Sequence, residues 1–200
     1  MNPAMNPATN PIASPIRVEA PGVEPVSLAE MRAYLRLDPD DGGAEDALLA
    51  ALVAAARAAL ERETRRILVP GRFRLTLAAW PPGGRLPLPL CPVTALLRAG
   101  LAGPDGALEE LAPGLVRLGG DAFEAPCLLV DPAVPRLDGH RAIVEVAAGF
   151  GGDGPALPEP LGLAIRRLAA GWFEHRGDEP GGAVPPDVAA LAAPFRRLHL

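Results

Sequence analysis

The sequence predicts an α+β fold, a mainly helical bundle with a small antiparallel β region inserted into it. Three observations predict this fold. Two helical patterns follow each other within residues 24–68, a third precedes residue 177, and short stretches with strand periodicity lie between them. The helices are expected at four ranges: 27–37, 45–67, 158–176 and 186–193.

The first helix has a complete start signal. Ser27 can cap the first free backbone amides, and Glu30 can reach back to the Ser27 amide, so the two residues form a capping box. Val26 and Met31 stand at the positions of a hydrophobic staple. Pro39 pushes the residue before it out of the helical region, so we expect the helix to end just before this proline.

The second helix is long and alanine-rich. One face carries apolar residues at helical spacing: Leu49, Leu52, Val53, Ala56, Leu60 and Ile67. Acids lie at its start and arginines at its end, which suits the helix dipole: Glu45 and Asp46, then Arg62, Arg65 and Arg66. A helix with such a narrow leucine stripe packs closely against its neighbours, which makes it a poor place for a catalytic pocket.

Short strands are expected between the second and third helices. Residues 72–77 alternate apolar and polar side chains, as a half-buried strand does. Pro87 and Pro89 cannot donate ladder hydrogen bonds, so residues 86–90 must lie at a sheet edge or be polyproline-like. The other strands are expected at 93–101 and 107–111, which form a hairpin, and at 115–118, 127–130 and 142–147.

The third long helix carries Trp172 on an apolar stripe, and Gly177 is its expected C-terminal cap. A short helix follows and ends at Pro194. We therefore divide the chain into a flexible N-terminal arm, a single domain with a β insertion at about 71–150, and a C-terminal tail, at residues 1–24, 25–194 and 195–200.

Composition excludes several classes of function. A net charge of −5 argues against an electrostatic nucleic-acid binder. No apolar run approaches the roughly 20 residues that span a bilayer, and residues 1–15 lack the regions of a signal peptide, so we expect no membrane contact and assembly in the bacterial cytoplasm. All 19 basic residues are arginine, which indicates a GC-rich genome.

Three candidate chemical sites are weak. The glycines of residues 149–154 could form a phosphate loop, but no Lys-Ser/Thr follows them. The acids of residues 38–46 lack the ligand order of a calcium loop. Cys91 and Cys127 have no metal-ligand spacing, and Cys127 with His140 is the least unfavourable catalytic pair. We expect no catalytic residues, metal or cofactor.

An ordered set of segments resembles the head-tail connector (adaptor, or head-completion) family of long-tailed bacteriophages and phage-derived gene transfer agents. The capping box, short helix, acidic turn and long Ala/Leu helix ending in arginine are its first part. The second is the helix from Pro158 that ends in Trp172-Phe173-Glu174-His175-Arg176, and the third is the closing segment from Val184. Together they cover roughly half of the chain in the family's order.

The resemblance implies a structural protein of the virion or gene transfer agent particle neck, and no enzyme. About twelve copies would form a ring between the portal and a tail-side stopper or tail terminator, through contacts that repeat and close. DNA would pass through the channel only as cargo, and the acidic net charge would keep it from adhering. The GC-rich composition favours a gene transfer agent over a phage.

Partner or subunit contacts are expected at the end of the third helix and in the tail: Glu174, Arg176, Phe195, Arg196, Arg197, Leu198, His199 and Leu200. Two interpretations stay open for both segments, since Glu174 and Arg176 could form a solvated helix end and the tail could be a disordered terminus. The tail could instead fold on a partner by strand addition or groove docking.

Two other classes of function remain alternatives. A small hydrolase built on the β region would require Cys127 and His140 to converge with a carboxylate in one pocket. A helical DNA-binding regulator would use the cluster of Arg62, Arg65 and Arg66.

Overall fold

The computed structural model describes residues 14–38, 42–175 and 184–197. The chain divides into two compact units, which we treat separately. The β unit lies within residues 1–20 and 71–148, and the helical unit lies within residues 21–70 and 149–200.

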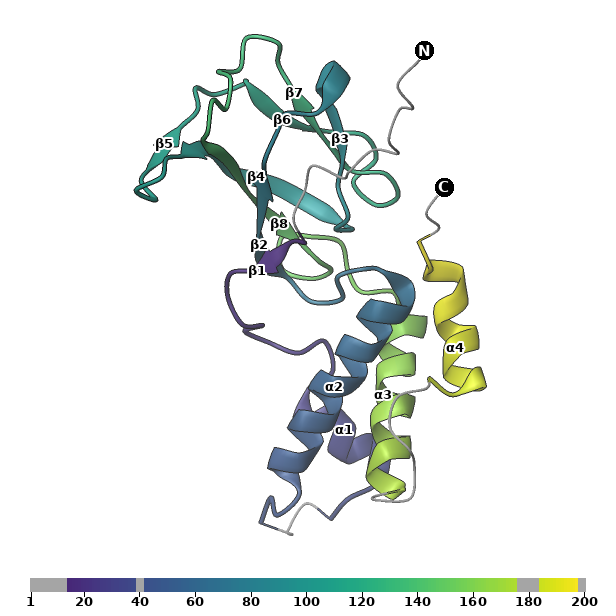
Figure 1. Ribbon diagram of the computed structural model, residues 1–200. Helices are drawn as coiled ribbons and strands as arrows, with labels where there is room; N and C mark the ends of the chain where they lie inside the picture. Colours follow the sequence, from purple (N-terminus) through teal and green to yellow (C-terminus); the bar gives the residue numbers. More distant parts are fainter. Residues whose placement is uncertain (1–13, 39–41, 176–183, 198–200) are drawn as a thin grey trace, which may run out of the picture. The chain divides into compact units, whose positions relative to one another are not determined.

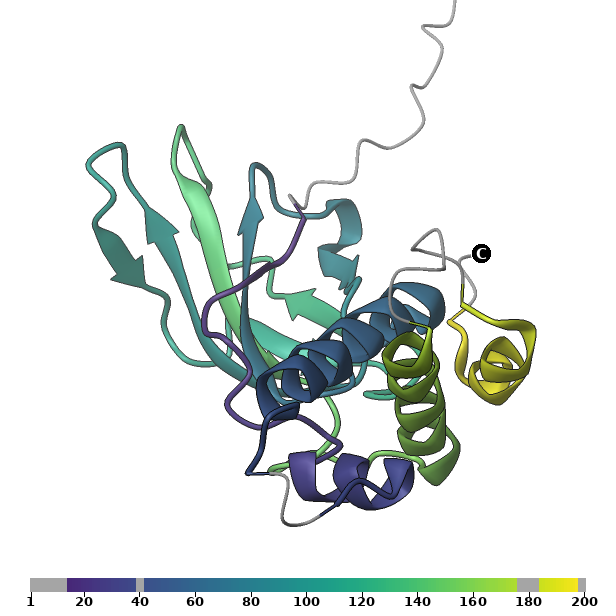
Figure 2. The ribbon, with the colours of Figure 1, turned by 90° about the horizontal axis from the view of Figure 1, so that it is seen from below.

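The helical unit contains α1 (Leu28–Leu35), α2 (Asp46–Thr64), α3 (Glu159–Glu174) and α4 (Pro186–Ala192), followed by the 3-10 turn η2 (Ala193–Phe195). Helix α3 lies between α2 and α4, and α1 contacts both α2 and α3 (Figure 1; Figure 2). The predicted apolar stripes meet in one core, except for Ile67, which lies beyond the end of α2. The fully buried side chains of this core include Met31, Leu49, Leu60, Leu161 and Ile165.

The predicted start of α1 is confirmed. The Glu30 amide donates to Ser27 Oγ at 3.2 Å, and the Ser27 amide donates to Glu30 Oε2 at 2.7 Å. These bonds from the Ser27 amide and hydroxyl lower the pKa of Glu30 below its ordinary value. The reciprocal bonds satisfy two backbone donors that the helix itself leaves unpaired.

We expect Ser27→Ala to destabilise the helical unit by about 1 kcal/mol, because the Glu30 amide loses its acceptor. Chemical denaturation of the purified variant measures the change in free energy of unfolding. Ala29→Ser is the matched control, since it changes an exposed position of the same helix outside the box. An unchanged stability of Ser27→Ala would show that the box does not hold the start of α1.

Two helices end earlier than the sequence predicts. Arg36 and Arg65 adopt the left-handed conformation, with φ of 55° and 56°, and so terminate α1 and α2 before residues 37 and 67. Glycine or asparagine usually adopts this conformation at helix ends. The two arginines therefore gave no sequence signal for the end of either helix.

The β unit holds two antiparallel sheets (Figure 1). The five-stranded sheet has the order β1-β2-β8-β4-β5, with bounds Ile16–Arg17, Gly71–Leu77, Arg141–Ala148, Val93–Ala102 and Leu108–Glu110. The three-stranded sheet has the order β3-β7-β6, with bounds Arg85–Pro87, Cys127–Val130 and Val116–Gly119. For residues 86–90 the sequence predicted either a sheet edge or a polyproline-like segment. The proline-containing β3 is an edge strand, which agrees with the first alternative.

The expectation of a mainly helical bundle is wrong. Helices account for 32% and strands for 24% of the described residues, and the strands form two sheets rather than one small region. Part of the reason is the early end of α1 and α2, which shortens the helices. The strands also build a core of their own, with Leu75, Leu128 and Val144 fully buried.

Candidate interface sites

The first candidate site is the junction between the end of α2 and the start of the tail. The Arg66 guanidinium donates from Nε to the Phe195 carbonyl at 2.6 Å, and the Arg197 amide donates to the Thr64 carbonyl at 2.9 Å. Arg196 forms an ion pair with Glu63. The described start of the tail therefore lies against α2 of its own chain.

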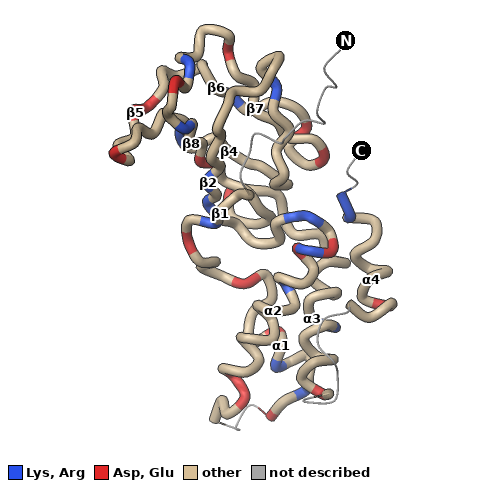
Figure 3. The backbone as a smooth tube through the Cα atoms, in the orientation of Figure 1, with Lys and Arg blue, Asp and Glu red and all other residues tan. Residues whose placement is uncertain are grey.

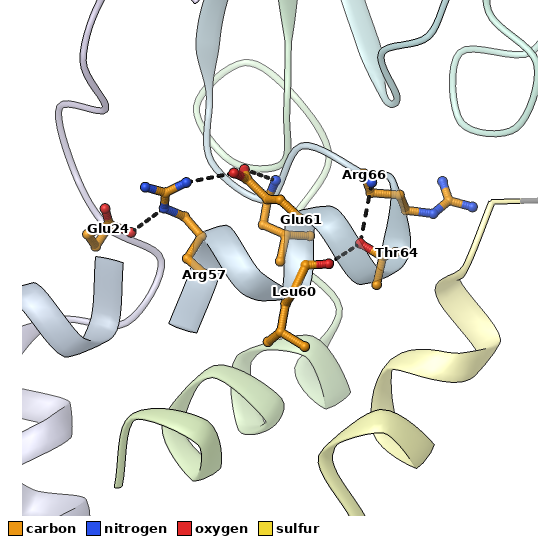
Figure 4. Close-up of polar contacts among 7 residues, drawn as sticks. Glu24, Arg57, Leu60, Glu61, Thr64 and Arg66 are labelled. Carbon is orange, nitrogen blue, oxygen red and sulfur yellow. Dashed lines mark hydrogen bonds and ion pairs between the residues drawn. The ribbon is translucent and has the colours of Figure 1, made fainter. Parts of the chain in front are cut away.

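A polar network supports this end of α2 (Figure 4). Thr64 Oγ1 donates to the Leu60 carbonyl at 2.7 Å and accepts from the Arg66 amide at 3.3 Å. One turn earlier, the Arg57 guanidinium donates to Glu24 and to Glu61, both at 2.7 Å. Burial of Arg57 lowers its pKa, but these two carboxylates outweigh that effect and raise the pKa above its ordinary value.

The residues predicted for partner contacts are only partly described. Glu174 is exposed at the end of α3, and Phe195, Arg196 and Arg197 lie at the junction with α2. Arg176, Leu198, His199 and Leu200 lie outside the described residues. Three of the predicted residues, all in the tail, therefore contact the end of α2, whereas Glu174 lies at the end of α3.

The second candidate site is a cluster of charges on the five-stranded sheet. Glu145 on β8 is 0% exposed, and three arginines from the two neighbouring strands donate to its carboxylate. Arg72 Nε lies 2.8 Å from Glu145 Oε2, whereas Arg74 Nε and a terminal nitrogen of Arg98 each lie 2.9 Å from Oε1. Each arginine side chain is itself more than a third exposed.

The arginines set the charge state of this cluster. The hydrogen bond from Arg98, together with those from Arg74 and Arg72, outweighs the opposing effect of burial and lowers the pKa of Glu145 from 4.5 to about 2. The carboxylate is therefore ionised at neutral pH and accepts from all three guanidinium groups, of which Arg72 also forms an ion pair with Glu19 at 3.7 Å. Figure 3 shows the basic positions in blue along β2 and next to β8.

This cluster was not predicted from the sequence, although the sequence contains a signal for it. Alternation on β2 buries Phe73 and Leu75 and turns Arg72 and Arg74 to the opposite face. A single acid, Glu145, interrupts the apolar run of β8. What the sequence lacked was the strand order, which places β8 between β2 and β4.

The candidate chemical sites gain no support. Within the described residues, no group of three His, Cys, Asp or Glu side chains could hold a metal ion, and no helix combines the length and the hydrophobicity of a membrane span. Cys127 is buried on β7 of the three-stranded sheet, whereas the His140 ring lies 3.0 Å from the Leu137 carbonyl, just before β8. Arg66 of the proposed DNA-binding cluster is buried at the tail junction.

The chain is similar to solved chains of gene transfer agent particles. No protein-family model and no curated protein matches the chain. A chain in the neck of an empty gene transfer agent particle, computed with C6 symmetry, is 34% identical with a TM-score of 0.80, over 94% of this chain and 97% of that chain. A chain in the virion of a native gene transfer agent particle is also 34% identical, with a TM-score of 0.79 and the same coverage. A chain in the neck of a native particle, computed with C12 symmetry, is 31% identical with a TM-score of 0.73 over the same shares of both chains.

Proposed function

This chain belongs to the family of neck proteins of gene transfer agent particles, and on that premise we propose that it is their head-tail connector, or adaptor. The predicted location in the particle neck is confirmed, since the matched chains come from such necks. The observation that carries the proposal is the match over 94% of this chain and 97% of the neck chain, which includes both units.

The proposed assembly is a ring of about twelve copies, stacked between the portal and the stopper or tail terminator. The necks that contain the similar chains were computed with C6 and C12 symmetry, which supports a ring of repeated copies. Residues 25–194 act in this proposal as one connector domain with its β insertion, while residues 1–24 and 195–200 are an arm and a tail that reach neighbouring proteins.

The role is structural, without catalysis, and DNA is only transiting cargo. The net charge of −5 supports weak adhesion of duplex DNA to the channel. We expect the purified protein to show no salt-sensitive duplex binding in a mobility-shift assay at about 0.15 M salt. Tight binding that weakens steeply with added salt would contradict this part of the proposal.

Reconstitution with the portal protein tests the proposed function. The purified chain is mixed with portal assemblies, and the complexes are measured by sedimentation and electron microscopy. We expect an added ring of density on one face of the portal, with cyclic symmetry. A chain that stays monomeric and does not bind the portal would contradict the proposal.

A further inference from the structure

The first residues of the chain repeat a four-residue pattern. Residues 2–17 read as Asn-Pro-Ala-Met, Asn-Pro-Ala-Thr, Asn-Pro-Ile-Ala and Ser-Pro-Ile-Arg, and each unit has proline in second place: Pro3, Pro7, Pro11 and Pro15. A period of four is a multiple of the two-residue period of a strand, so a strand would place all these prolines on the same edge. A polyproline helix, with roughly three residues per turn, would scatter them around its axis. The pattern therefore favours a strand.

The fourth unit of this repeat forms a strand at the edge of the five-stranded sheet. It contains β1, in which Ile16 lies opposite Arg74 of β2. The Val18 amide continues this register with a bond of 2.8 Å to the Arg72 carbonyl. Because backbone donors alternate between the two edges of an antiparallel strand, even-numbered residues face β2 and Pro15 faces away from it. Proline thus takes the position that an edge strand tolerates, where no ladder donor is needed.

Strand β2 is too short to pair with the other three units. Continued backward from Ile16 opposite Arg74, the register would reach Leu77, the last residue of β2, at residue 13. No partner on β2 is then left for the units within residues 2–13. If these units share the strand conformation of the fourth, they need a different sheet edge.

Strand β4 offers such an edge. Strand β8 pairs with one side of β4 along its length, whereas β5 pairs with the other side only along Gly100–Ala102. On the β5 side, the Val93 amide donates to a carbonyl of the loop before β7, and the Ala99 carbonyl accepts from the amide that follows β5. Between these two bonds, residues 94–98 have no backbone partner on this side within the part of the chain that the structure describes.

A groove of about 350 Å³ runs along this open edge. It is lined by residues 96–99 of β4 on one side, and by residues 110–114 and Val116 on the other. Leu97 is the extra residue of a β-bulge and is 47% exposed. The opposite wall turns at residues 113–114, so it offers no continuous ladder. A strand that enters the groove can therefore pair on its β4 edge only, as the one-sided prolines of the repeat require.

Charge does not carry binding in this groove. Residues 2–13 contain no charged side chain, and the two charged residues that line the groove, Arg98 and Glu110, attract each other. Strand addition takes its affinity from main-chain hydrogen bonds, and Leu97 supplies an apolar contact beside them. The interaction therefore depends on backbone donors, which a proline substitution removes one at a time.

We propose that residues 2–13 of one copy add as an edge strand to residues 94–98 of β4 in the neighbouring copy of the ring. This inference rests on the proposed ring and deepens it by assigning a contact between copies. Even-numbered residues of the repeat bond to the β4 edge, and the prolines face the turn at residues 113–114.

The sheet order favours the neighbouring copy over the chain's own groove. Strand β1 lies at one edge of the sheet, and β2 and β8 separate it from β4 (Figure 1). The repeat therefore leaves the sheet at the edge opposite to its own groove. A contact between two different surfaces of the same chain is the heterologous kind that repeats around a ring.

Cross-linking between two variants tests the contact. Rings are assembled on the portal from equal amounts of Asn6→Cys and Leu97→Cys, and a short bismaleimide is added. A product that joins the two variants can form only between copies, and the native Cys91 and Cys127 are buried. The control replaces Leu97→Cys by Arg136→Cys, an 89% exposed side chain of the β unit that does not line the groove. We expect the yield with Leu97→Cys to be at least about tenfold higher.

Two adjacent proline substitutions test the strand pairing itself. Ala8→Pro removes a donor that faces β4 in the proposed strand, whereas Thr9→Pro removes one on the same side as the native prolines. Each is added to Asn6→Cys and cross-linked to Leu97→Cys. We expect Ala8→Pro to lower the yield about tenfold, because a carbonyl of β4 loses its donor, and Thr9→Pro to leave it unchanged.

The outcomes separate this contact from the ring itself. Rings with no excess yield at Leu97→Cys over Arg136→Cys, or with equal losses from Ala8→Pro and Thr9→Pro, would overturn the contact while the connector function stands. So would a double variant, Asn6→Cys with Leu97→Cys, that cross-links only within one chain. Failure of the unaltered chain to form rings on the portal would overturn both proposals. Thermal melting checks that all variants fold.

Discussion

Glu145→Gln is expected to cost the β unit about 3 kcal/mol of stability at pH 7. The substitution keeps the size of the side chain but removes the negative charge that Arg72, Arg74 and Arg98 share. The three guanidinium groups then lose the one carboxylate that all of them contact, although Arg72 keeps an ion pair with Glu19 at 3.7 Å. Hydrogen exchange at the amides of β8 measures the loss, because it reports the free energy of opening this sheet separately from the helical unit.

An exposed acid on the same sheet provides the control. Glu109→Gln makes the same chemical change at an exposed position on β5, and we expect its effect to stay within about 0.5 kcal/mol. Equal effects of the two substitutions would show that the cluster does not stabilise the sheet.

The same cluster predicts a dependence of stability on pH. The folded pKa of Glu145, about 2, lies below the ordinary value of 4.5, so the folded state binds this proton less readily than the unfolded state. The contribution is fully present above pH 4.5 and is lost as the pH falls toward 2. The stabilities of the unaltered protein and Glu145→Gln should therefore converge over this range. Curves that stay parallel down to pH 2 would contradict the assigned pKa.

Local signals predicted the elements, and long-range contacts decided the rest of the fold. The capping box at Ser27 and the hairpin of β4 and β5 are encoded by neighbouring residues, so the sequence alone located them. The left-handed conformations of Arg36 and Arg65 are not encoded by neighbouring residues, because an arginine side chain does not favour that conformation. Because these helix ends were not predicted, the helical share of the chain was predicted too high.

The Glu145 cluster shows why the sites were harder to predict than the elements. Strand periodicity assigns Arg74 and Glu145 to one face or the other, but it does not say which strands are neighbours. The partners Arg74 and Arg98 lie 71 and 47 residues from Glu145 in the sequence. The tail contact is similar, since Arg66 and Phe195 are 129 residues apart. Such pairs become visible only when the chain is folded.

Gly149→Ala is expected to destabilise the helical unit by about 3 kcal/mol or more, because two independent penalties act at this position. Gly149 has a φ of +122°, a conformation that residues with a side chain rarely adopt. A Cβ there would also lie 2.3 Å from the carbonyl oxygen of Val69, a backbone atom that cannot rotate away. The next residue fixes the approach, since the Phe150 amide donates to the Ile67 carbonyl at 3.2 Å.

Gly42→Ala separates the two penalties. Gly42 has a φ of +69° in the same unit, but a Cβ there would meet no atom within 4 Å. It should therefore cost only the backbone strain, about 1 kcal/mol. Chemical denaturation of both variants, with hydrogen exchange at α2 and α3, gives the two values side by side. If Gly149→Ala costs no more than Gly42→Ala, then the backbone at Val69 gives way, and the close approach of residues 69 and 149 does not constrain the path of the chain into α3.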